Sequence, residues 1–168
     1  MKKLLLILLC LPMIGFGQIN RIETGNDKRT EIGSLSNVLG DMKILKTVSE
    51  YSNLTTYNIS YRNCKYMNIN DYSEFTFNET GNDLENLYSM IIDEFDFEKK
   101  GVLYKHALNY KIFNEIKIDI GKGRTLFLMY GKKGLAPITF KFLYKDESGN
   151  ESWSQWLNKK QINKLFGK

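Results

Sequence analysis

Beyond the first 17 residues, two side chains belong to the types that most often carry nucleophilic or acid–base chemistry: the single histidine, His106, and the thiol of Cys64. An imidazole can transfer protons near neutral pH, and a thiolate is the usual sulfur nucleophile. Cys64 lies in the stretch YRNCKY, whose cations Arg62 and Lys65 favour the thiolate, although a lone cysteine is more often a small apolar residue. A site around His106 or Cys64 would make the protein a small secreted hydrolase, which we keep as the alternative function.

The same residue types are too few to predict a metal centre. Beyond Cys10, which lies in the predicted signal peptide over 1–17, one histidine and one cysteine supply only half of a four-ligand zinc set. Four carboxylates gather in DEFDFEKK, residues 93–100, but their spacing is not that of a calcium-binding loop. We therefore expect no metal and no other cofactor, and an enzyme is the less favoured class.

A second group of candidate residues consists of the cations in two glycine-containing stretches, GKGR and GKKG. The glycine amides of GKGR, beside its cations, could bind an anion, but the alternating residues around both stretches favour plain hairpin turns. Residues 18–98 contain 7 Lys and Arg against 14 Asp and Glu, whereas residues 99–168 contain 15 against 5. This asymmetry suggests a weak anion-binding surface, although a dispersed set of solvated lysines is the interpretation that the spread of these cations favours. The candidate residues are Lys122, Arg124, Lys132 and Lys133.

The partners expected for such a surface are an anionic polysaccharide or a lipid surface, and we expect no nucleic acid. Consecutive hairpin turns of a meander lie at opposite ends of the sheet, so the four cations should form two pairs and bind weakly. The attraction should fall steeply between about 50 and 300 mM salt, as the screening length drops below about 10 Å.

The first 17 residues predict a signal peptide. Lys2 and Lys3 precede an apolar run over 4–14, and Gly15 and Gly17 suit the positions before a signal-peptidase site. Cleavage before Gln18 would export the protein to the periplasm or the medium and leave Cys64 as the only cysteine. The run is too short to span a bilayer, and we expect no transmembrane segment in the mature chain.

The mature chain predicts a loose N-terminal arm over 18–33 and a single α+β domain over 34–168. Residues 42–50 fit either a helix or a strand, and we favour the strand. Alternating apolar residues predict further strands over 55–61 and 74–78. The spacing of apolar residues over 83–95 predicts one central amphipathic helix, with Asn82 as its N-cap and Glu85 completing a capping box.

The second half of the sequence predicts an antiparallel meander followed by a short C-terminal helix. Its strands are expected over 116–120, 126–130, 138–144 and 153–157. Trp153 and Trp156 would face opposite sides of the last strand, so one of them is a candidate for a surface contact. Asn158 and Gln161 predict a capping box for the final helix, and Gly167 predicts its end. The fold class is therefore α+β, with antiparallel sheets, one central amphipathic helix and a short C-terminal helix.

Three stretches resemble small uncharacterised exported bacterial proteins. They are the Lys-Lys and oligo-leucine signal ending in Gly-Gln, the YRNxKY pattern at 61–66, and KKQINKLFGK at 159–168. The resemblance implies export, and no activity is attached to it. We therefore expect an exported, non-enzymatic binding or structural module that contacts anionic envelope components.

Overall fold

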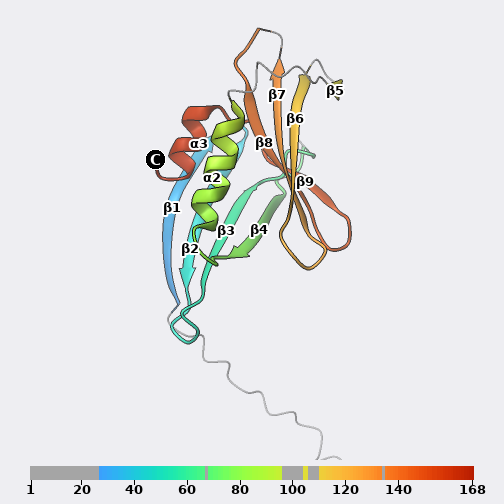
Figure 1. Ribbon diagram of the computed structural model, residues 1–168. Helices are drawn as coiled ribbons and strands as arrows, with labels where there is room; N and C mark the ends of the chain where they lie inside the picture. Colours follow the sequence, from blue (N-terminus) through green and yellow to red (C-terminus); the bar gives the residue numbers. More distant parts are fainter. Residues whose placement is uncertain (1–26, 67, 96–103, 106–109, 134) are drawn as a thin grey trace, which may run out of the picture.

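The computed structural model describes residues 27–66, 68–95, 104–105, 110–133 and 135–168, and these residues form two antiparallel sheets and two helices (Figure 1). The first sheet has the order β1-β2-β3-β4 and the second the order β5-β6-β7-β8-β9. The elements of the first half are β1 Lys28–Asn37, β2 Gly40–Val48, β3 Thr55–Arg62, β4 Tyr72–Asn78 and α2 Asp83–Asp93. Those of the second half are β5 Tyr104–Lys105, β6 Tyr110–Asp119, β7 Thr125–Lys133, β8 Thr139–Lys145, β9 Glu151–Trp153 and α3 Lys159–Leu165. The predicted α+β class with antiparallel sheets is confirmed.

The core lies between the facing surfaces of the two sheets, because alternate residues of each strand point inward. On β3 these are the buried residues Tyr57, Ile59 and Tyr61. The aromatic rings of β4 and β8 meet directly, with 5.5 Å between the ring centroids of Phe75 and Phe142. Both sheets therefore depend on one shared apolar layer.

The helices add to this core at different places. Leu87 and Ile91 of α2 are buried, and the Tyr130 hydroxyl of β7 donates a 3.1 Å hydrogen bond to the Ile91 carbonyl. The second helix, α3, packs on β1, where Gly33 lies against the carbonyl groups of its last turn (Figure 1). Neither of the two described helices combines the length and the apolar character needed to cross a bilayer.

Local sequence signals are confirmed most clearly at α3. The Asn158 side chain accepts a hydrogen bond from the Gln161 amide, and the Gln161 side chain accepts one from the Asn158 amide. Gly167 ends the helix with a φ of 70°, a conformation that glycine adopts without strain. The Lys168 amide then donates to the Asn163 carbonyl, which completes a Schellman-type end.

Three local predictions differ from the structure. Residues 28–33 of the expected loose arm belong to β1, because they pair with β2 and pack under α3. The Asn82 side chain makes no capping bond to α2. Instead, the Asp83 carboxylate accepts from Thr80 and the Glu79 carboxylate accepts from the Asp83 amide, so the cap lies just upstream. The last strand runs over Glu151–Trp153 rather than 153–157.

The close approach of β1 and α3 at Gly33 gives a stability prediction. A Cβ at this position would overlap the backbone carbonyls of Lys164 and Leu165, which cannot move without unpacking the helix. We expect Gly33→Ala to lower the free energy of unfolding by about 1–3 kcal/mol, measured by urea denaturation. Gly81→Ala is the matched control, because no described atom lies within 4 Å of a Cβ built there. Equal effects of the two substitutions would contradict the predicted packing.

Candidate functional site

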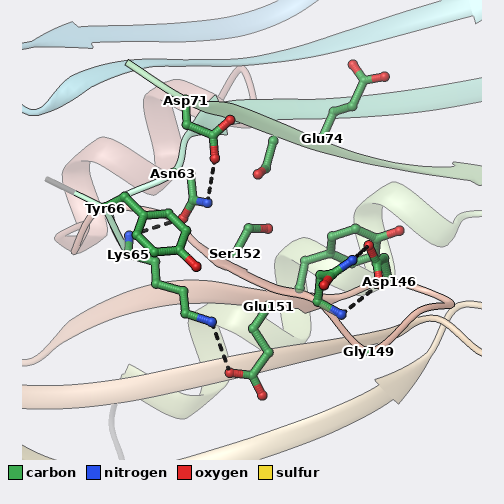
Figure 2. Close-up of a pocket in the computed structure, with 12 residues that line it drawn as sticks. Asn63, Lys65, Tyr66, Asp71, Glu74, Asp146, Gly149, Glu151 and Ser152 are labelled. Carbon is green, nitrogen blue, oxygen red and sulfur yellow. Dashed lines mark hydrogen bonds and ion pairs between the residues drawn. The ribbon is translucent and has the colours of Figure 1, made fainter. Parts of the chain in front are cut away.

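A cleft of about 610 Å³ opens between β4 and the hairpin formed by β8 and β9 (Figure 2). Its first wall comes from the loop that follows β3 and from the start of β4. Its second wall comes from the end of β8, the turn over 146–150 and β9. The lining residues are Asn63, Lys65, Tyr66, Asp71, Ser73, Glu74, Tyr144, Asp146, Gly149, Asn150, Glu151 and Ser152. Most of these side chains are polar, as the sticks in Figure 2 show.

Asn63 closes one end of the cleft by joining the two sheets. Its Oδ1 atom accepts from the Trp153 amide at 3.2 Å and from the Lys65 amide at 3.1 Å, while its Nδ2 donates to the Asp71 carboxylate at 2.8 Å. Beside it, the Cys64 amide donates to the Trp153 carbonyl at 2.7 Å. Asn63 is only 3% exposed, so this junction is shielded from water.

The walls of the cleft carry an excess of negative charge. Asp71 and Glu74 lie on one side, and Asp146 and Glu151 lie on the other (Figure 2). Lys65 is the one cation among the described lining residues, and its Nζ atom is 3.9 Å from the Glu151 carboxylate.

Three of the wall carboxylates already accept hydrogen bonds from the protein, and Glu151 is paired with Lys65. Hydrogen bonds from the Asn150 side chain and amide hold the pKa of Asp146 below its usual value. Glu74 accepts from the Asn58 side chain at 3.0 Å, and Asp71 accepts from Asn63. A carboxylate has about four lone-pair positions, so these groups keep acceptor capacity for a ligand.

The floor of the cleft is neutral. The Tyr61 hydroxyl and the Ser152 hydroxyl lie 2.9 Å apart in a buried hydrogen bond. Burial raises the pKa of Tyr61 far above its usual value, so this phenol does not ionise in the physiological range. The arrangement can accept hydrogen bonds and attract cations, and its floor offers no ionised nucleophile.

A second cluster of interest lies on the face of the second sheet that points away from the core. Lys141 of β8 is 7% exposed, and its ammonium group lies 4.1 Å from the ring centroid of Trp153 and 4.8 Å from that of Trp156. The cation therefore rests between two indole rings, an attraction that is strong when water is excluded. No carboxylate of the described residues forms an ion pair with it.

Burial lowers the pKa of Lys141 to about 8, although the nearby Cys64 acts in the opposite direction. The two tryptophans also correct a prediction from the sequence. Because β9 ends at Trp153 and the chain then leaves the strand conformation, Trp153 and Trp156 meet at the same ammonium group instead of facing opposite sides.

The four predicted anion-binding cations lie in two places. Lys122 and Arg124 belong to the turn before β7, whereas Lys132 and Lys133 lie at the other end of that strand. Two Arg124 nitrogens donate to the carbonyls of Gly121 and Ile120, so its guanidinium folds over its own turn. The Gly121 amide is also used internally, because it donates to the Asp119 carboxylate.

Of the candidate nucleophile Cys64 and the candidate base His106, only Cys64 lies in the described part of the chain. His106 lies outside the described residues, as do Asp96 and Glu98 of the acidic stretch. Burial raises the pKa of the Cys64 thiol, while the charges of Arg62 and Lys141 act against this shift only in part. Within the described part of the chain, no three His, Cys, Asp or Glu side chains are placed to hold a metal ion.

Lys141 gives a prediction for the pH dependence of stability. The unfolded chain keeps this proton up to about pH 10.5, whereas the folded protein releases it near pH 8. The unfolded state therefore binds more protons between these values, and this residue makes the free energy of unfolding rise with pH in that window. Between pH 7 and 9.5, we expect Lys141 to raise the free energy of unfolding of the natural protein by on the order of 1–3 kcal/mol. The Lys141→Met variant should lack this increase, and urea denaturation across the pH range measures it.

Lys145→Met is the control for this measurement, because Lys145 lies on the same strand and is exposed. It should leave the pH profile of the unfolding free energy as in the natural protein. If the profiles of the Lys141→Met and natural proteins coincide, Lys141 is not desolvated in solution.

Comparison with known proteins identifies no relative: no family model, no curated protein and no solved structure matches the chain. The chemistry of the cleft and of the cations is therefore the basis for a functional assignment.

Proposed function

We propose that the protein is an exported, non-enzymatic binding module whose ligand lies in the acidic cleft between β4 and the β8–β9 hairpin. The observation that carries this proposal is the cleft itself, about 610 Å³ of open space lined by four acidic residues and one lysine. Pockets with a few convergent polar groups are the usual places for ligands. The signal peptide expected over 1–17 supports export, although these residues lie outside the described part of the chain.

The state of the polar groups favours binding over catalysis. General acids and bases usually have a pKa shifted toward neutrality by burial or like charge. In the cleft, hydrogen bonds lower the pKa of Asp146. The thiol of Cys64, the centre of the alternative hydrolase, is shifted away from the reactive thiolate by burial.

The proposed contact with anionic envelope components uses other residues. Lys122 with Arg124 and Lys132 with Lys133 would act as two separate basic points on one sheet. Their separation along β7 supports weak attraction to an extended polyanion more than capture of one small anion. The anionic partner and the cleft ligand would then bind at different surfaces.

We also infer that α2 is the one central amphipathic helix of this fold. Its buried side chains Leu87 and Ile91 face the core, while Glu85 and Ser89 are exposed. Tyr130 contacts its carbonyl groups from β7. In this role the helix would keep both sheets at a fixed separation behind the cleft.

An NMR titration tests both parts of the proposal. Spermine should shift amide signals at Asp71, Glu74 and Glu151, and a heparin oligosaccharide should shift those at Lys122 and Lys132. Both sets of shifts should weaken several-fold between 50 and 300 mM salt, because they arise from charge attraction. Spermine shifts confined to residues outside the cleft would contradict the cleft assignment. Absent heparin shifts at low salt would remove the anionic partner.

The reactivity of Cys64 separates the binding module from the thiol hydrolase. We expect Ellman's reagent at pH 7.5 to react at least tenfold more slowly with the folded protein than with the urea-unfolded protein, because burial raises the thiol pKa. Cys64→Ser should keep the spermine shifts of the cleft unchanged. A faster reaction in the folded state would favour the hydrolase.

A further inference from the structure

The free edges of the two sheets are not equally protected. Exposed edges invite pairing with another chain, and proteins usually block them with short strands, lysines, prolines, bulges or a covering element. The edge strand β1 carries Lys28 and Arg29, has a bulge between Glu31 and Gly33, and is covered by α3. At the edges of the other sheet, β5 has 2 residues and β9 has 3.

β4 has none of these protections. It is a 7-residue edge strand with the sequence YSEFTFN, which contains no lysine and no proline, and its pairing with β3 has no bulge. The Tyr72 side chain on its outward face is 58% exposed. β4 is therefore the one described sheet edge on which a further strand could be placed without an obstacle built into the sequence.

The hydrogen-bond pattern shows which backbone groups are available. The Asn63 amide donates to the Asp71 carbonyl, and the Glu79 amide donates to the Thr55 carbonyl, so residues with odd numbers form the bonded pairs of β3 and β4. In an antiparallel ladder the intervening residues point their amide and carbonyl groups the other way. Those of Tyr72, Glu74 and Thr76 therefore face away from β3, and no other described strand pairs with them.

This free edge borders the acidic cleft. Ser73 and Glu74 of β4 line the cleft, and the opposite wall is formed by Glu151 and the turn over 146–150 (Figure 2). The two walls are joined at the Asn63 end by the hydrogen bonds to Trp153. A segment lying along β4 could thus form hydrogen bonds with the backbone edge of β4, and acidic residues of both cleft walls would lie around it.

We propose that the free edge of β4 accepts an extended, lysine- or arginine-bearing peptide segment of a partner protein, which adds to the first sheet as a fifth strand. The inference rests on the proposed function, because it names the ligand class of the same cleft. Strand addition supplies affinity through main-chain hydrogen bonds, and the side chains of the added strand supply selectivity.

The charges of the cleft decide the class of peptide. Alternate side chains of an added strand point to opposite faces. One set would meet Glu74 on the outer face, where its carboxylate reaches Asn58, and the other set would meet Asp71 and Glu151 inside the cleft. A second copy of this chain is disfavoured as the occupant, because pairing two β4 edges would bring two acidic clefts together.

The experiment compares three acetylated and amidated peptides of equal length. The first alternates valine and lysine, the second alternates valine and glutamate, and the third alternates proline and lysine, which keeps the charge but removes half of the amide donors. We expect the valine–lysine peptide to bind at least tenfold more tightly than either control at 50 mM salt. It should also slow hydrogen exchange of the Glu74 and Thr76 amides at least tenfold in the natural protein.

A variant pair tests the edge directly. Thr76→Pro removes an outward amide without removing a bond to β3 and should weaken the valine–lysine peptide at least tenfold, whereas Thr76→Val keeps the amide and should bind as the natural protein does. The exchange measurement on the natural protein keeps the test valid if the proline variant unfolds.

Several outcomes would overturn strand addition. These are equal binding of the proline–lysine peptide, equal binding of the valine–glutamate peptide, or unchanged exchange at Glu74 and Thr76 despite binding. If the natural protein already forms a dimer through β4, the occupant of this edge is a second copy of the chain and not a peptide of a partner protein. If spermine still shifts the amide signals of the cleft in any of these cases, the proposed binding function stands without strand addition. If spermine does not shift them, the proposed binding function is wrong whatever the peptides do.

Discussion

The arrangement of the cleft depends on one side-chain amide, that of Asn63. Asn63 directly follows β3, and its side chain forms hydrogen bonds with Lys65 in the next loop, with Asp71 just before β4 and with Trp153, the last residue of β9. Loss of this amide would leave buried donors without partners, which is more damaging than the loss of an exposed hydrogen bond. The aromatic contact between Phe75 and Phe142 then holds the sheets together below the cleft. Both walls take their relative position from these two interactions.

Much of the fold could be predicted from the sequence, because its signals are local. Alternation over Tyr57, Ile59 and Tyr61 identifies the inner face of β3, and the Asn158 and Gln161 pair identifies the start of α3. The prediction of a loose arm over 18–33 was wrong in part, because Gly33 packs against α3, which lies far away in the sequence. The predicted cap of α2 was wrong because Asn82 makes no side-chain bond to the helix, and the Glu79 carboxylate accepts from its first amide, that of Asp83, instead.

The site was harder to predict than the fold. Asn63 was passed over although it lies next to Cys64, because an amide that joins two sheets has no sequence pattern of its own. Lys141 did leave a signal, since it stands between Phe140 and Phe142 in a strand whose outward face also carries the apolar Leu143. An outward face with apolar residues indicates that something covers it, and the covering rings are those of Trp153 and Trp156. Their convergence required the bend after β9, which spacing alone did not reveal.

The junction at Asn63 joins the two walls of the cleft through buried hydrogen bonds to Trp153. The Lys65 to Glu151 ion pair crosses between the same walls, two residues along the chain from each side of that junction. Ion pairs between partly exposed side chains are weak, so a cation carried by an occupant could take the place of the Lys65 ammonium group at little cost. Lys65 would then act as an internal competitor for the acidic cleft, and an occupant without a positive charge would gain nothing from displacing it.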